Sequence, residues 1–318
     1  MLLIVALTVS VPAWAQPEAW VINSRGDFSD STRIGALWTV DLATGQAELE
    51  GRSRIDAYIF IEGLSFSADG ELFGVDDDTN TLVRLGTSSG NAVAVNQAER
   101  NLDLPLANHD FGLSFTCDGR LLVSTDSGSL GSALYEADPA TGKALLIGET
   151  GAPIVDLATI GDQVFGIGRG MASEAHPASP NLYLVDPVGG EAALIGPLGS
   201  AVDSYNKAGL ATDADGTLWA VTERRSPSDP DRSIASQIIR IDPHTGMAEH
   251  VAYTQATEYG QELVGVESLA VAPPGDCDRG IAPVQPAVVP VMTDPGRWLL
   301  VLCVLALAAF SLRRAAAS

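Results

Sequence analysis

The chain has 318 residues, of which 40 are acidic and 18 are basic, so its formal net charge at pH 7 is −22. A nucleic-acid-binding protein needs a basic surface that displaces counterions from phosphates, and this charge excludes that class. Two readings of the acidic surface stay open. One is solubility through mutual repulsion, and the other is the binding of a hard cation such as calcium, which prefers carboxylate oxygens.

The N-terminus has the pattern of a secretory signal peptide over residues 1–15. Leu2 to Val11 is almost entirely apolar, and Ala13-Trp14-Ala15 supplies the small residues of a cleavage site, which places the mature start at Gln16. No positively charged segment precedes the apolar run. A buried first strand is the alternative, but Pro12 favours export because proline is rare in central strands.

A turn sequence that ends in glycine recurs along the chain. Its closing glycines stand at positions 45, 90, 142, 190 and 246, so the unit repeats about every 50 residues. The copies are Asp41-Leu-Ala-Thr-Gly45, Leu85-Gly-Thr-Ser-Ser-Gly90, Asp138-Pro-Ala-Thr-Gly142, Asp186-Pro-Val-Gly-Gly190 and Asp242-Pro-His-Thr-Gly246. This period is typical of propellers and solenoids, which host unrelated activities, so the chemistry must be sought in the loops.

Each unit also contains four strand patterns. A first strand of small residues ends in Asp-Gly, the preferred pair for a tight hairpin, as in residues 62–70, 111–119 and 208–216. Second strands are expected at 72–75, 121–124, 164–167 and 218–221, third strands at 133–137, 181–185 and 237–241, and fourth strands at 144–147, 192–195 and 248–251. Four short strands per unit are typical of a propeller blade. A β-sandwich is the alternative, but a sandwich does not require a recurring turn.

The count of units predicts an all-β fold, a five-bladed β-propeller over residues 16–278. Complete blades are expected at residues 62–100, 109–151, 154–200 and 206–255. The fifth combines a C-terminal strand, Val266–Val271, with N-terminal strands at 21–23, 36–40 and 46–49. Such closure removes the open sheet edges that would otherwise aggregate.

The cysteines suggest one disulfide. Cys303 lies in an apolar tail, which leaves Cys117 and Cys277 in a domain whose predicted compartment permits a bridge. Cys117 falls in the first turn of its blade, and Cys277 falls just past the corresponding position of the closing blade. We therefore predict that the two are bonded and that the bridge locks the seam of the ring.

The irregular loops should gather at one end of the channel. They are residues 24–35, 76–78, 124–132, 169–180 and 223–236, of which 172–180 and 226–233 are candidate lids or merely solvated loops. The candidate ligand residues at that end are Glu62, Asp76, Asp110, Glu223 and Glu267. A ring of carboxylates could hold calcium or a polar ligand. The alternative is that these groups are solvated or paired with Lys207, Arg224 or Arg225.

Signals of catalysis are few in the sequence. It has no Gly-x-Ser-x-Gly nucleophile elbow, no histidine pair at metal-ligand spacing and no Gly-x-Gly-x-x-Gly nucleotide loop. His109 is the one histidine expected near the channel mouth, where it could act as a base or be purely structural.

The C-terminus predicts a membrane anchor. A Pro-rich linker spans 279–297, and residues 298–314 form an apolar helix closed by arginines that should stay cytoplasmic. A buried core helix is the alternative. The tail resembles the IPTL-CTERM type of C-terminal sorting signal of Gram-negative bacteria through Pro290-Val291-Met292, Gly296-Arg297-Trp298 and Arg313-Arg314. Val-Met stands in place of Thr-Leu, and the glycine and tryptophan are in a different order. The resemblance implies an exported propeller of a Gram-negative bacterium, held at the membrane or cell surface, with release after C-terminal processing as the alternative.

Two functions follow as expectations. The first is a binding or scaffolding module at the cell envelope, which meets a protein or polysaccharide through its acidic, loop-rich face. The second is a calcium-dependent hydrolase of lactones or phosphate esters, with Glu62, Asp110 and Glu267 as ligands and His109 as a base. Convergent metal ligands at the channel mouth would favour the second.

Overall fold

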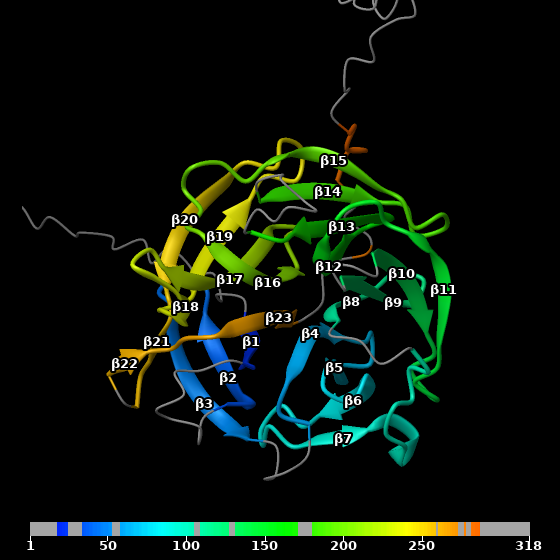
Figure 1. Cartoon of the computed structure of the whole chain (residues 1–318), viewed down its shortest axis with the longest axis horizontal. Coiled ribbons are helices and arrows are strands. Elements are labelled where there is room, and N and C mark those ends of the chain that lie inside the picture. Colours follow the sequence, from blue (N-terminus) through cyan, green and yellow to red (C-terminus); the bar gives the residue numbers. More distant parts are fainter. Residues whose placement is uncertain are drawn as a thin grey trace, which may run out of the picture. The chain divides into compact units, whose positions relative to one another are not determined.

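Five sheets surround a central channel, and each contains one copy of the sequence repeat (Figure 1). The computed structural model describes residues 18–24, 34–52, 58–104, 109–126, 131–170, 180–258, 260–272, 277 and 281–286. Residues 287–318 form a separate unit and lie outside these ranges. The predicted signal peptide with Ala15 and Gln16, and the tail with Pro290, Trp298, Arg313 and Arg314, therefore lie outside the described residues.

The strands follow the predicted blade pattern, from the channel outward. Blade 1 holds β23 (Val266–Ala272), β1 (Glu18–Asn23), β2 (Ala36–Asp41) and β3 (Gln46–Arg52), and blade 2 holds β4 (Ile61–Phe66), β5 (Leu72–Asp76), β6 (Thr81–Leu85) and β7 (Ala92–Ala94). Blade 3 holds β8 (Asp110–Phe115), β9 (Leu121–Asp126), β10 (Ser132–Ala137) and β11 (Ala144–Glu149), and blade 4 holds β12 (Ile154–Ile160), β13 (Gln163–Gly168), β14 (Asn181–Val185) and β15 (Ala192–Pro197). Blade 5 holds β16 (Tyr205–Thr212), β17 (Leu218–Ser226), β19 (Gln237–Ile241) and β20 (Ala248–Tyr253). The five-bladed fold is confirmed.

The two ends of the described chain share blade 1, as predicted. β1 pairs antiparallel with β23, with Val21 opposite Leu269 and Glu18 opposite Ala272. On its other side β1 pairs with β2, where Val21 faces Trp38. Two short strands that the sequence did not predict, β21 (Gln255–Ala256) and β22 (Gln261–Glu262), cover the outer edge of β3. Backbone hydrogen bonds between first and last strands thus close the ring.

The inner strands approach one another closely around the channel. β4, β8, β12, β16 and β23 contact each other in that order, and β23 returns to β4. A Cβ atom on Gly209 of β16 would lie 2.4 Å from the backbone nitrogen of Leu269, and one on Gly112 of β8 would lie 2.3 Å from the Cα atom of Asp156. Side chains do not fit at these crossings, which explains the small residues of the first strands.

The recurring turn has a local and a tertiary cause. In its aspartate copies the side chain accepts the backbone N–H two residues on, as in Ala140 N to Asp138 Oδ1 at 2.8 Å, while the closing glycine takes a positive φ of 80° at Gly142. The glycine also packs against the preceding blade, since a Cβ on Gly190 would lie 2.8 Å from Gly148 and one on Gly246 would lie 2.6 Å from Gly196. One turn therefore both ends the third strand and fits between neighbouring blades.

The predicted disulfide is present. The Cα atoms of Cys117 and Cys277 lie 5.4 Å apart, within the range for an unforced bridge. Cys117 follows β8 in the first turn of blade 3, whereas the chain leaves blade 1 at the end of β23. The bridge thus joins a residue beyond the closing strand to a blade two positions around the ring, and the seam itself is closed by the pairing of β1 with β23.

One of the segments predicted as irregular is partly regular. Within residues 223–236, β17 continues to Ser226 and turns back as β18 (Asp229–Ser233), with Arg225 opposite Ser233. Most of the candidate lid 172–180, and the centres of the loops at 24–35 and 124–132, lie outside the described residues. Where the structure is described, no helix has the length and apolar character needed to cross a membrane.

Candidate functional site

Charged residues meet at the end of the channel where the inner strands begin, here called the mouth. Glu62 of β4, Asp110 of β8 and Glu267 of β23 surround the ammonium group of Lys207 from β16. The Lys207 Nζ atom lies 2.8 Å from Asp110 Oδ1 and 3.7 Å from Glu267 Oε2, and it also contacts Glu62 Oε1. Four blades therefore contribute one charged side chain each to a single cluster, which we call the mouth cluster.

The mouth cluster continues through further polar contacts. Arg169, just after β13, contacts Asp110 and lies 2.9 Å from Asp126 at the end of β9. The Ser24 hydroxyl donates to Glu267 at 2.5 Å, and the Phe111 N–H donates to Glu62 Oε2 at 3.0 Å. All five blades are thus linked at this end of the channel, because blade 4 joins through Arg169.

Burial governs the protonation of the cluster. Burial raises the pKa of Glu62 well above its usual range, with the Lys207 ammonium opposing that rise. For Lys207 itself burial lowers the pKa, but the carboxylates of Glu267, Glu62 and Asp110 together raise it well above its usual range. Lys207 is therefore a cation at neutral pH, and one ammonium is shared among several crowded carboxyl groups.

Asp77 stands beside this cluster at the solvent boundary. Burial raises its pKa to about 6, against the attraction of Lys207 and a hydrogen bond with Glu62. The Asp77 side chain is partly exposed, whereas Glu62 is 3% exposed. Asp77 and Glu62 thus form a pair of carboxyl groups that favours keeping a proton, because two buried negative charges side by side are costly.

Three of the predicted site residues lie apart from the Lys207 ammonium. Asp76 accepts hydrogen bonds from the Thr79 hydroxyl at 2.7 Å and the Phe60 N–H at 3.3 Å, so it closes its own loop. Glu223 lies 2.8 Å from Arg225 and accepts a bond from Ser233, and it is fully buried. His109 is 7% exposed, and its ring packs against Phe111. Arg224, a possible partner of the carboxylates, pairs instead with Asp203 at 2.9 Å.

The sequence analysis did not identify Asp156 of β12, which is fully buried in the channel wall. Its carboxylate accepts backbone N–H groups from Leu113 at 2.9 Å, Leu157 at 2.9 Å and Leu210 at 2.7 Å, and so joins three inner strands. The other inner strands carry Gly63, Gly112, Gly209 or Ser268 at this position. An aspartate in a column of glycines was the signal that could have revealed it.

The mouth cluster is arranged like a cation-binding site in which the cation is the ammonium group of Lys207. Its carboxylates come from different blades and point at one ammonium, which is 6% exposed. Among the described residues, no group of three or more His, Cys, Asp and Glu side chains is arranged to hold a metal ion. Calcium at this place would have to displace Lys207.

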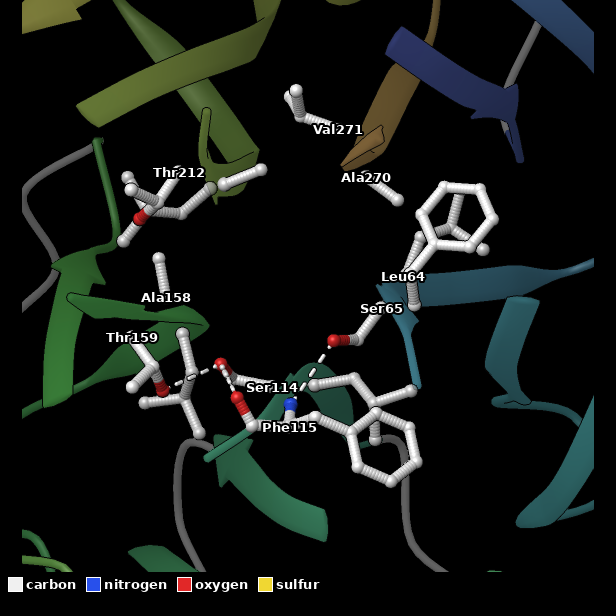
Figure 2. Close-up of a pocket in the computed structure, with 14 residues that line it drawn as sticks. Leu64, Ser65, Ser114, Phe115, Ala158, Thr159, Thr212, Ala270 and Val271 are labelled. Atoms are coloured by element: carbon white, nitrogen blue, oxygen red, sulfur yellow. Dashed lines mark hydrogen bonds between the residues drawn. The ribbon is translucent and has the colours of Figure 1, made fainter. Parts of the chain in front are cut away.

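Near the opposite end of the channel, where the first turns lie, the described residues that line the channel carry no charged side chain. A cavity of about 50 Å³ is lined there by aliphatic and aromatic side chains and by the hydroxyls of Ser65, Ser114, Thr159 and Thr212. Figure 2 shows Ser114 and Thr159 joined by a 3.0 Å hydrogen bond and Ser65 accepting the Phe115 N–H at 3.0 Å. The channel lining is therefore charged at the mouth and has no charged group around this cavity.

Comparison with solved structures finds bacterial propellers of several kinds. The gluconolactonase XC5397 of Xanthomonas campestris is 15% identical with a TM-score of 0.42, over 72% of this chain and 74% of that one. Virginiamycin B lyase of Staphylococcus aureus is 13% identical with a TM-score of 0.39, over 71% of this chain and 64% of that one. TolB of Acinetobacter baumannii is 14% identical with a TM-score of 0.41, over 76% of this chain and 52% of that one. No protein-family model and no curated protein sequence matches the chain.

Proposed function

We propose that this protein is an exported binding module, anchored at the cell envelope of a Gram-negative bacterium, that meets a protein or polysaccharide through the acidic face around the channel mouth. The observation that supports binding over catalysis is the position of Lys207. Its ammonium neutralises the carboxylates that a metal-dependent enzyme would need free. The convergent charges thus brace the scaffold, and recognition is left to the surrounding loops.

The rigidity of the mouth supports the same proposal. Ion pairs and hydrogen bonds tie all five blades together there, through Lys207, Arg169 and Ser24 among others. A fixed rim lowers the entropic cost of holding a ligand on loops that project from it. Exposed acidic residues such as Asp78, next to the mouth cluster, would add attraction for a cationic partner and make its binding depend on salt.

A pair of variants in blade 2 tests which face binds. Asp78 is exposed at the mouth end and Asp69 is exposed in the first turn at the other end, so D78N and D69N remove the same charge from opposite faces. Binding of the purified full chain to isolated envelope polysaccharide and to intact cells would be measured by interferometry at low and high salt. We expect D78N to weaken binding by about 1.5- to 5-fold at low salt, the range for a rim charge, and D69N to leave it unchanged. Equal effects of both variants would contradict the assignment of the face.

The calcium-dependent hydrolase stays as a second candidate because carboxylates from three blades converge on one cation. Calcium titration of the full chain by calorimetry separates the two functions. The binding proposal expects no heat at millimolar calcium, since the ion would compete with the tethered ammonium of Lys207. Saturable heat, together with a calcium-dependent rise in melting temperature, would favour the hydrolase instead.

A further inference from the structure

The last described residues of the chain dock under the propeller at its first-turn end. Val284 is 4% exposed within the core between blades 4 and 5, and Ile281 packs against the same core. Gln163, the first residue of β13, holds both, because its Oε1 accepts the Val284 N–H at 2.7 Å and its Nε2 lies 3.4 Å from the Ile281 carbonyl oxygen. We call Cys277 together with residues 281–286 the C-terminal strap.

The strap has one covalent and one weak attachment. The covalent one is the bond between Cys277 and Cys117, and both cysteines are exposed to solvent. The weak one consists of the burial of Val284, the packing of Ile281 and one Gln163 contact to each of the two residues. Ordering a segment of this length costs backbone entropy that so few contacts offset only in part. The chain after β23 already tethers the strap, and the disulfide shortens the segment before Val284, which raises the effective concentration of the docking contacts.

We propose that the C-terminal strap is a redox-sensitive clasp, released from the propeller when a dithiol reduces the Cys117–Cys277 bond. A thiolate of the reductant attacks one sulfur and forms a mixed disulfide. Its second thiol then displaces the protein sulfur, so that two cysteine thiols and one oxidised reductant result. The ring itself stays closed, because β1 and β23 pair through backbone hydrogen bonds that do not involve the bridge.

Release of the C-terminal strap lengthens the connection between the propeller and the tail of the chain. With the clasp closed, only residues 287–297 separate the docked strap from the apolar segment at 298–312. With the clasp open, the last described attachment of the chain to the propeller is the end of β23 at Ala272. If the tail is anchored as proposed above, reduction lengthens the segment that connects the propeller to its anchor. The clasp itself does not depend on that anchor, so its test stands apart from the proposed function.

Hydrogen exchange of the full chain in detergent micelles tests the clasp. On addition of dithiothreitol we expect the Val284 amide to exchange at least about tenfold faster, while residues 266–272 of β23 keep their protection. The C117S/C277S variant should show the fast exchange without reductant. V284D, which keeps the disulfide, should also show it, and reduction should then add little.

Two results would overturn the proposal. One is unchanged exchange of Val284 both under dithiothreitol and in C117S/C277S, because docking would then not depend on the bridge. The other is loss of protection in β23 together with that of Val284, because the bridge would then hold the whole fold and not a local strap.

Discussion

Single side chains in the channel wall connect neighbouring blades, and Asp156 is one that does so through backbone N–H groups. Its carboxylate accepts three backbone N–H groups from three inner strands. Burial raises its pKa well above the usual range, while the N–H groups of Leu210, Leu113 and Leu157 lower it. Burial of this carboxyl group is unfavourable, but it gives a hydrogen-bond acceptor to three backbone N–H groups that would otherwise be buried without one.

Replacing Asp156 tests this role. D156A leaves three buried N–H groups unpaired, so we expect it to lower the free energy of unfolding by about 3–5 kcal/mol. D156N should cost less, because its carbonyl oxygen can still serve Leu113 and Leu157, which share one oxygen in the native protein. Urea denaturation followed by circular dichroism measures both. D69A, at an exposed turn, is the control, and equal losses in D156A and D69A would refute the role.

Lys207 gives a second prediction at this scale. K207M leaves buried carboxylates unpaired and should cost about 3–5 kcal/mol at pH 8. The pKa of Glu62 is raised by burial, so its stabilising contribution is present in full below its unfolded pKa of about 4.3 and is lost as pH rises. The decrease in the free energy of unfolding caused by K207M should therefore be smaller at pH 5 than at pH 8.

The matched variant for Lys207 is K143M, which removes an exposed ion pair with Asp103. It should change stability by less than about 1 kcal/mol at either pH. Denaturant midpoints at pH 5 and pH 8 compare the two variants. The carboxylates would have to be well solvated if K207M lowered the free energy of unfolding equally at both pH values, or by as little as K143M does.

Asp77 predicts a pH dependence of the native protein. Its pKa is raised to about 6 in the folded state, so its contribution to stability is full below the unfolded value of about 3.9 and is lost as pH rises through 6. D77N does not titrate. The stability of D77N relative to the native protein should therefore increase between pH 4 and pH 7 and then level off. Thermal melts across this range measure the difference, and two parallel curves would contradict the shifted pKa.

At the scale of the strand, the inner ring depends on close backbone approach. A Cβ on Gly209 would collide with the backbone of Ser268 and Leu269, which belong to another blade and cannot yield separately. G209A should therefore cost about 1–3 kcal/mol, the range for overpacking. G86A is the control, because the one close contact of its Cβ would be the Ser89 hydroxyl at 2.6 Å, which can rotate away. Equal melting temperatures for the two variants would show that the inner strands can separate freely.

The strands were predictable because their signals are local. An Asp-Gly pair or an Asp-x-x-Thr-Gly line ends a strand through its own backbone geometry, so the blades at 62–100, 109–151, 154–200 and 206–255 could be placed from the sequence. The hairpin of β17 and β18 was missed because its arginines and serines carry no apolar alternation. Its pairing is supported by side-chain contacts of Glu223 with Arg225 and Ser233 that only the folded chain provides.

The site was less predictable because it is a property of the ring. Glu62, Asp110 and Glu267 could be placed at the mouth by strand position, since each stands at or near the start of an inner strand. That they share the ammonium of Lys207 depends on the relative height and rotation of four blades. Nothing local in the sequence distinguishes an aspartate that closes its own loop, such as Asp76, from one that reaches into the cluster.

At the scale of the whole molecule, ring closure fixes where the chain ends leave the propeller. Glu18 pairs with Ala272, so both ends of blade 1 lie at the first-turn end, away from the mouth cluster. The docked strap keeps the C-terminal exit on that side. The mouth cluster and the point where the strap leaves the propeller thus lie at opposite ends of the channel.

Deleting residues 290–318 tests the proposed membrane anchor. The apolar run and its arginines should retain the protein in the membrane, so we expect the full chain to stay in the membrane pellet after an alkaline wash and the truncated chain to appear in the medium or periplasm. The truncation leaves the strap and the Cys117–Cys277 bridge in place, so a normal melting temperature shows that its release is not caused by misfolding. A truncated chain that remained in the pellet while folded would mean that the propeller itself, and not its tail, binds the membrane.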